Sequence, residues 1–161
     1  MELFSLLEKG NTIEIIKFIE NNRVDINSVD KFTFNLLMKS INRGITDLSE
    51  YLIEQGVDLN YQNEKGQTIL HLLAINYDKK ILEKALEKGV NVNLQDIYGN
   101  EALWTAVFND KGFGKRIEMI QLLIKYGANP YHSNNAGKSP IEFAKTAGYP
   151  DVIGILDINP V

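Results

Sequence analysis

An internal repeat of 33 residues is the feature that most constrains what this chain can fold into. Three short phrases recur at that spacing, namely residues 24–27 (VDIN), 57–60 (VDLN) and 90–93 (VNVN). A related phrase at residues 127–131 (GANPY) arrives 38 residues after the third. A fixed period of this length is typical of solenoids, in which each unit buries its apolar face against its neighbours.

The most regular unit reads as turn, helix, turn, helix. Asn63 to Gly66 favours a tight turn, because Asn and Gly tolerate the positive φ that such turns require. Thr68 suits a helix N-cap, and residues 69–74 then place apolar side chains on one helical face. A second apolar helix follows and is predicted to end at Gly89 in the manner of a glycine C-cap.

The whole chain, residues 1–161, is expected to form one domain of about five such units. The first unit lacks a leading turn, and the last ends before another turn begins, so both are expected to act as caps. The fourth unit carries a five-residue insertion, Asp110 to Gly114, between its helices. The expected units are residues 1–27, 28–60, 61–93, 94–131 and 132–161.

Two units depart from the regular pattern at positions that matter for local geometry. Thr33 stands where the third unit has Gly66, and a β-branched residue at positive φ would be strained. We therefore expect an altered turn in the second unit. In the fourth unit Trp104 occupies the position of His71.

Several phrases in one register resemble the consensus of the ankyrin-repeat family. Residues 66–71 (GQTILH) are similar to the family's G-x-T-P-L-H, and residues 89–93 (GVNVN) to its G-A-D-V-N. Residues 127–130 and 137–141 add to this resemblance, which covers essentially the whole chain. It implies an all-α ankyrin-repeat solenoid of helix-turn-helix units with short hairpin-like fingers. It also implies that the first helices and the fingers line a concave face.

Composition limits the classes of partner and compartment. The chain has no cysteine, which excludes disulfides and thiolate ligands and fits a reducing, cytoplasmic location. A net charge of -4 argues against nucleic-acid binding and would suit a basic protein partner. No apolar run is long enough to span a bilayer, and the first residues lack the basic region of a signal peptide. We expect no membrane association and a monomer when the chain is alone.

The sequence offers little that could support catalysis, a metal or a cofactor. His71 and His132 are the only histidines and lie in different units. The resemblance implies that His71 supports its turn by hydrogen bonding, and a surface role is expected for His132. The run Gly112 to Lys115 lacks the frame of a phosphate-binding loop. We expect a non-enzymatic protein without metal or cofactor.

Candidate binding residues come from aromatic and polar positions that the family's layout turns toward the concave face. Large apolar groups are not needed there for folding, and interfaces are enriched in aromatic residues and Arg. Phe32 and Phe34 have an alternative, since they could fold back and cover the glycine-less turn. The candidate protein-binding residues are Phe32, Phe34, Arg43, Lys65, Ile75, Asn76, Tyr98, Phe108, Asn109, Lys111 and Phe113.

These observations predict a protein-protein interaction module that presents a rigid face. A capped array without a catalytic or targeting domain suggests a stoichiometric inhibitor, such as an immunity protein that neutralises a toxin. An adaptor that joins two proteins is the first alternative. An enzyme or small-ligand binder that uses the groove around Trp104 and the inserted loop is the second.

Overall fold

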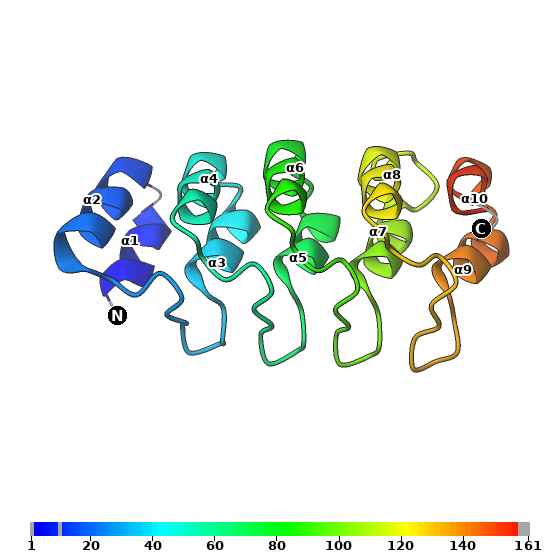
Figure 1. Cartoon of the computed structure of the whole chain (residues 1–161), viewed down its shortest axis with the longest axis horizontal. Helices are drawn as coiled ribbons and strands as arrows, with labels where there is room; N and C mark the ends of the chain where they lie inside the picture. The colour runs from blue at the N-terminus through cyan, green and yellow to red at the C-terminus, as the bar shows by residue number, and fades with distance from the viewer. Residues whose placement is uncertain (1, 10, 158–161) are drawn as a thin grey trace.

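The computed structural model describes residues 2–9 and 11–157 as a row of helix pairs (Figure 1). The N-terminal pair lies at one end of the row and the C-terminal pair at the other. The helices are α1 Glu2–Lys9, α2 Thr12–Asn22, α3 Leu36–Arg43, α4 Thr46–Glu54, α5 Ile69–Ile75, α6 Lys79–Glu87, α7 Ala102–Asp110, α8 Ile117–Lys125, α9 Pro140–Ala147 and α10 Pro150–Leu156.

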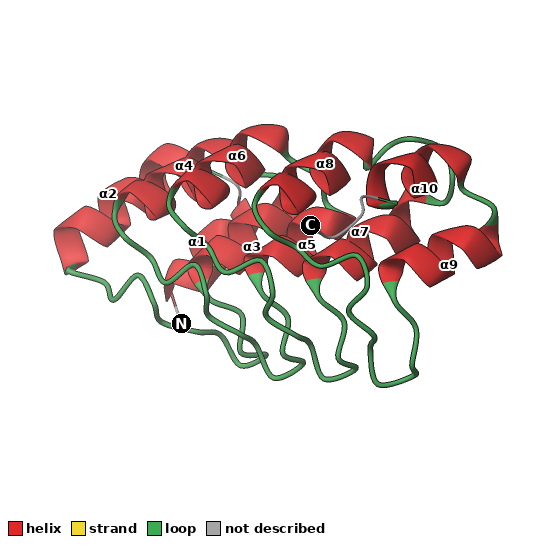
Figure 2. Cartoon of the chain, turned by 45° about the vertical axis from the view of Figure 1, so that its right-hand side comes forward, coloured by secondary structure: helices red, strands yellow, loops and turns green. Residues whose placement is uncertain are grey.

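The helices form two layers, and loops project from one of them (Figures 1 and 2). The projecting loops are residues 28–35, 61–68, 94–101 and 132–139, and we call them fingers 1 to 4. The inner layer comprises the fingers, α1, α3, α5, α7 and α9. The α7–α8 loop leaves the end of α7 and lies beside α8 (Figure 1). The outer layer comprises α2, α4, α6, α8, α10 and the turns that follow them. The expected all-α solenoid is confirmed, and the part of the chain described contains no strand.

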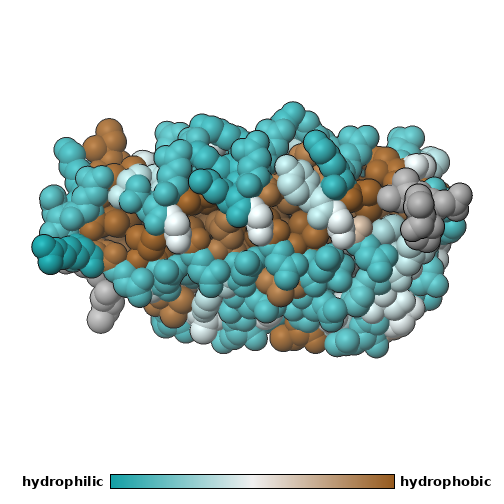
Figure 3. Space-filling view, in the orientation of Figure 1, coloured by the Kyte–Doolittle hydropathy of each residue, from teal (hydrophilic) through white to brown (hydrophobic). Residues whose placement is uncertain are grey.

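One continuous apolar core runs through the row. It extends from Leu3 in α1 to Leu156 in α10, and its central members Leu70 and Leu103 are completely buried. Figure 3 shows an apolar band along the long axis, bordered by hydrophilic residues on both sides. No helix in residues 2–9 and 11–157 has the length and apolar character needed to cross a membrane.

Neighbouring fingers meet backbone to backbone. Gly66 has φ +70° and donates its N–H to the Asn63 carbonyl at 2.8 Å, which closes the turn of finger 2. A Cβ at Gly66 would lie 2.9 Å from the Cα of Asp96 in finger 3. The Ile97 N–H donates to the Lys65 carbonyl at 3.0 Å across the same contact. Glycine is required here because the approach leaves no room for a side chain.

The expectation of an altered turn at Thr33 is wrong. Thr33 keeps the positive φ of the glycine position, at 59°, and its N–H donates to the Asp30 carbonyl at 3.0 Å. Its hydroxyl accepts the Glu64 N–H and donates to the Phe32 carbonyl, both at 2.7 Å. The hydroxyl therefore bridges fingers 1 and 2 at the point where fingers 2 and 3 make a direct backbone bond. This bridge offsets the strain of a β-branched residue at positive φ.

His71 fastens finger 2, α5 and finger 3 together. It is buried, its Nδ1 accepts the Thr68 N–H at 3.1 Å, and its Nε2 donates to the Asn100 carbonyl at 2.9 Å. Both bonds are satisfied by the neutral ring with the proton on Nε2. Burial lowers the pKa of His71 below its ordinary value of 6.5. The structural role that the family resemblance implied is what the geometry shows.

His71 makes folding stability depend on pH. Because its folded pKa lies below 6.5, the unfolded chain binds more protons between the two values. The stabilisation is complete above about pH 6.5 and declines as the pH falls, by up to about 1.4 kcal/mol per pH unit. Urea unfolding at pH 7.5 and pH 5 should show a larger loss for the wild type than for His71→Gln. Parallel losses in the two proteins would contradict this assignment.

The hydroxyl bridge at Thr33 can be tested with two substitutions, one that removes the hydroxyl and one that keeps it. Thr33→Val keeps the β-branched shape but removes the hydroxyl, and should lower the free energy of unfolding by about 1 kcal/mol. Thr33→Ser keeps the hydroxyl and should stay near the wild type. Urea denaturation of all three proteins measures the difference. Equal stability of the Val variant and the wild type would show that the bridge contributes nothing.

Candidate functional site

Exposed large apolar side chains gather on the inner layer. Phe113 is 74% exposed, Tyr98 64% and Phe32 53%. None of them belongs to the core, so folding does not require an apolar side chain at these positions. The inner layer carries Val29, Phe32, Ile75, Ile97, Tyr98 and Phe108. Phe113 lies in the α7–α8 loop, and Ile13, Tyr126 and Tyr131 belong to the outer layer. Figure 3 shows such apolar residues as separate spots along the rim of fingers.

An aromatic cluster joins α7 to the C-terminal helix pair. The rings of Trp104 and Phe108 stack with centroids 5.3 Å apart, and Phe143 of α9 lies 5.5 Å from Trp104 and 5.7 Å from Phe108. Tyr149 meets Phe143 edge to face at 6.1 Å. Such pairs are stabilising beyond the area they bury. Phe108 is nevertheless 46% exposed, so one side of the cluster faces outward.

The inserted loop is a folded structure held beside this cluster. The carboxylate of Asp110 is buried and accepts the N–H groups of Gly114 and Arg116 at 3.1 and 2.7 Å. A Cβ at Gly112 would lie 2.9 Å from the Tyr149 ring, so the loop backbone packs against that ring. The loop thus holds the exposed Phe113 on a fixed base, and its role in recognition stays a prediction.

Arg116 ties the same loop back to the third unit. Its Nε donates to the Ala74 carbonyl at 2.8 Å, and its Nη2 donates to the Ile75 carbonyl at 2.6 Å. These carbonyls end α5, where Asn76 rather than a glycine follows the helix. The guanidinium also lies 5.8 Å from the centroid of the Tyr77 ring. Sequence reasoning missed this role, because the partner carbonyls are about one repeat away along the chain.

An apolar hollow lies at the N-terminal end of the inner layer. Its volume is about 610 Å³, and Phe32 and Arg43 both line it, together with α1 residues such as Phe4. Lys31 lies over the Phe32 ring at 4.9 Å, and Arg43 lies 3.6 Å from Glu8. Finger 1 has no finger in front of it within the described chain, so this side of it is open.

The structure distributes the predicted binding residues unevenly. Phe34 is half-buried against the core, whereas Phe32 stays exposed. Asn109 is half-buried and its side chain bonds to the Thr105 carbonyl of its own helix. Asn76 bonds to Asn42 across two units. The exposed members are Phe32, Arg43, Lys65, Ile75, Asn76, Tyr98, Phe108, Lys111 and Phe113, and their binding role stays a prediction.

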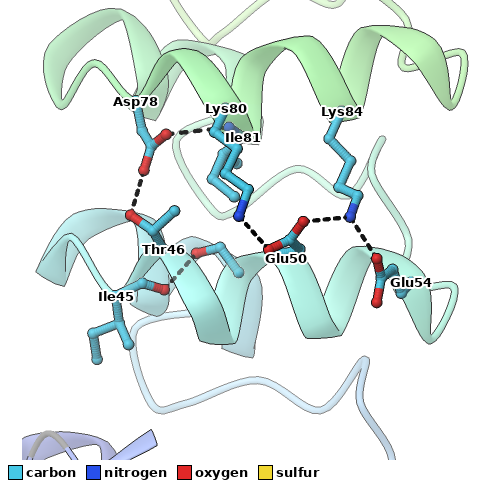
Figure 4. A network of polar contacts seen from close by, with 9 residues as sticks. Ile45, Thr46, Glu50, Glu54, Asp78, Lys80, Ile81 and Lys84 are labelled. Atoms are coloured by element: carbon cyan, nitrogen blue, oxygen red, sulfur yellow. Dashed lines mark hydrogen bonds and ion pairs between the residues drawn. The ribbon is translucent and has the colours of Figure 1, made fainter.

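The outer layer is occupied by ion pairs between neighbouring units (Figure 4). Lys84 of α6 contacts Glu50 and Glu54 of α4 at 2.8 and 2.5 Å, and Lys80 contacts Glu50 at 2.6 Å. Lys79 pairs with Glu118 of α8. The lysines hold the pKa of Glu50 below its ordinary value. These carboxylates are engaged in joining units, in agreement with their interpretation as a solvated face.

One titratable pair escaped the sequence analysis. Glu101 is buried at the N-cap position of α7, and its Oε1 lies 3.7 Å from Nδ1 of His132 in finger 4. Burial raises the pKa of Glu101, and nearby His132 acts in the opposite direction. His132 is half-buried and bonds to the Gly99 carbonyl at 3.3 Å, so the simple surface role expected for it is wrong. No sequence spacing joins these two residues.

No metal centre is formed by the residues that the structure describes. Nowhere in that part of the chain do three histidine or carboxylate side chains come together in a way that could hold an ion. The titratable residues instead fasten fingers and helices to one another, as His71 and Asp110 do.

Comparison with known proteins finds the same repeat elsewhere. A family model described as ankyrin repeats in three copies matches residues 3–96, 46–134 and 70–159. The putative ankyrin repeat protein L92 of Acanthamoeba polyphaga mimivirus is 37% identical over 83 residues, which cover 51% of this chain and 19% of that protein. The putative ankyrin repeat protein FPV031 of fowlpox virus (strain NVSL) is 30% identical over 142 residues, covering 86% and 38%.

A putative ankyrin repeat protein of Rickettsia bellii is 30% identical over 138 residues, covering 80% of this chain and 38% of its own length. The chain thus spans less than two fifths of the length of these relatives. The paired helices, the fingers that meet backbone to backbone and the matching family model all agree. The chain belongs to the ankyrin-repeat family.

Proposed function

We propose that this chain is a non-enzymatic module that binds a partner protein on its inner layer. Ankyrin repeats indicate a protein-protein interaction module. The observation that carries the choice of surface is the gathering of exposed aromatic side chains there, namely Phe32, Tyr98 and Phe108. Buried aromatic anchors supply most of the binding energy in many protein interfaces.

The mechanism is rigid presentation. Tyr98 stands on finger 3, whose backbone is bonded to both neighbours through Ile97 N–H and through the Tyr98 carbonyl, which accepts the Asn135 N–H at 3.0 Å. Phe108 is held by stacking on Trp104. Side chains that are already ordered lose little conformational entropy on binding, so more of the contact energy appears as affinity.

Inhibition is the finer role that we propose for this module. A rigid face that covers a functional surface of its partner blocks that surface in a one-to-one complex, as an immunity protein does with a toxin. The cytoplasmic location and the monomeric state of the free chain remain predictions within this proposal.

An adaptor role is the alternative that a specific observation favours. The hollow beside α1 and finger 1 and the aromatic cluster of α7 and α9 lie in different units of the row. Two partners could therefore bind to separate surfaces. The enzyme alternative centred on Trp104 has less support, because its ring is covered by Phe108 and Phe143.

The binding surface can be tested on the partner protein that co-purifies with the tagged chain from its native cell. Tyr98→Ala removes the most exposed aromatic finger residue without touching the core, and should weaken binding about tenfold or more by calorimetry. Tyr126→Ala, an exposed tyrosine of the outer layer, is the matched control and should bind normally. Normal binding by the Tyr98 variant, with loss in the Tyr126 variant, would refute the proposed surface.

The inhibitor and adaptor roles predict different patterns of loss. If the chain is an inhibitor with one partner, Tyr98→Ala should weaken that single complex and restore the partner's activity. If it is an adaptor, Phe32→Ala in the N-terminal hollow and Tyr98→Ala should each remove a different protein from the purified complex. Quantitative mass spectrometry of proteins retained by the two variants separates these outcomes.

A further inference from the structure

We propose that copies of this chain stack head to tail, with finger 4 of one copy against finger 1 of the next, so that the solenoid continues from copy to copy. The inference goes beyond the proposed function and limits the expected monomer to dilute solution. It rests on the contact that joins neighbouring fingers, because each end of the row presents one side of this contact without the other.

Neighbouring fingers are joined by a bond that recurs along the row. The N–H of the fourth residue of finger 3, Ile97, donates to the Lys65 carbonyl in finger 2 at 3.0 Å. The equivalent N–H of Asn135 in finger 4 donates to the Tyr98 carbonyl in finger 3, also at 3.0 Å. The fourth residue of finger 2 donates to the hydroxyl of Thr33 in finger 1. The later finger is the donor and the earlier finger the acceptor in all three contacts.

Finger 1 presents the donor of this contact without an acceptor. Its fourth residue is Lys31, which is exposed and whose N–H makes no hydrogen bond within the described chain. The apolar hollow of about 610 Å³ lies in front of this finger, lined by Phe4 and Leu7 of α1 and by Val29 and Phe32 of the finger itself. Each later finger has its predecessor on the equivalent side. The hollow is therefore where a preceding finger would lie.

Finger 4 presents the acceptor of the same contact without a donor. Its fifth residue is Ala136, the equivalent of the acceptor residues in fingers 2 and 3, and its carbonyl receives no hydrogen bond from any residue that the structure describes. A Cβ at Gly137 would meet nothing within 4 Å. In contrast, a Cβ at Gly66 or at Gly99 would lie 2.9 Å from a backbone atom of the next finger. The surface that receives a finger in the middle of the row is thus open at this end.

The terminal helix pairs also leave apolar side chains incompletely covered. In the four helices α3 to α6, Tyr51 and Ile75 are the apolar residues that are not buried. In the N-terminal pair Ile13 is exposed. The half-buried apolar side chains of the terminal pairs are Phe4, Leu6, Ile16 and Phe18 in α1 and α2, and Phe143, Ile153 and Ile155 in α9 and α10. A terminal repeat that acts as a cap needs a polar outer face, so these pairs retain surface that a further unit could cover.

A second copy of the chain matches both ends at once. Its finger 4 supplies the carbonyl that the Lys31 N–H lacks, on a tip of Ala136 and Gly137 where no large side chain hinders the approach of the backbone. The two ends lie at opposite extremes of the row, so the contact joins different copies (Figure 1). It is heterologous and leaves a free end on each assembly, so longer rows form as concentration rises. Tyr98 lies on finger 3, away from both ends.

Sedimentation velocity of the purified chain tests this proposal. The weight-average mass of the wild type should rise between about 5 and about 500 µM, because association follows mass action. The N-terminal variant Val29→Glu/Lys31→Pro places a charge in the hollow and removes the donor. Proline suits this position, the second of the turn closed by the Thr33 N–H and the Asp30 carbonyl. The C-terminal variant Gly137→Arg places a side chain where the next finger would lie.

Gly56→Arg is the matched control. Gly56 has a positive φ and open space around it, as Gly137 has, but lies in the turn after α4, in the middle of the row. The chain already holds Arg23 and Lys111 at positive φ, so an arginine at such a position is compatible with folding. The control should associate like the wild type, and each end variant about tenfold or more weakly. A mixture of the two end variants should form a dimer and no longer species, because each supplies the end that the other lacks.

A wild type that keeps the mass of a monomer over this range would overturn the inference, as would a mixture of the end variants that forms no dimer. Association that persists in both end variants, or that Gly56→Arg weakens equally, would also overturn it, because another surface would then be responsible. These outcomes leave the proposed function untouched, since that is tested by partner binding of Tyr98→Ala. Circular dichroism checks that each variant remains folded, and none of the substituted residues belongs to the core.

Discussion

The stacking of one repeat on the next is the constraint on which the rest of this structure depends. A pair of helices with seven to nine residues each cannot bury its apolar stripe alone, so Leu70 and Leu103 reach complete burial only because neighbouring units cover them. The fingers impose the register of this stacking. Gly66 lies directly against the backbone of Asp96, so finger 2 cannot move closer to finger 3.

The fold could be predicted because the residues that mark the repeat are those that join one unit to the next. The recurring asparagines illustrate this, since the side chain of Asn27 accepts the Asp58 N–H at 2.9 Å and that of Asn60 accepts the Asn91 N–H at 2.8 Å. The two acceptors, Asn27 and Asn60, are 33 residues apart, and so are the two donors, Asp58 and Asn91, so the period repeats the same bond from one pair of units to the next. His71 acts in the same way, with its contacts in finger 2 and finger 3.

The candidate site could be predicted only in part, because its details depend on contacts between residues far apart in sequence. Phe32 and Phe34 are the same residue type in the same finger, yet only Phe34 packs against the core. Arg116 finds its acceptors at the end of α5, and Glu101 finds His132 one finger away. Such partners are determined by the stacking geometry, and no local spacing reports them.

Departures from the repeat explain how a surface can be built without loss of the scaffold. Trp104 replaces the histidine of the third unit, and its buried Nε1 has no hydrogen-bond partner among the described residues, so the fastening made by His71 is absent there. The indole instead provides the plane on which Phe108 stacks and which Phe143 covers. Aromatic packing between α7 and α9 thereby takes over the joining of two units. Phe108, which stacks on Trp104, remains 46% exposed. The residue that replaces the histidine of the regular repeat therefore also supports part of the surface proposed to bind.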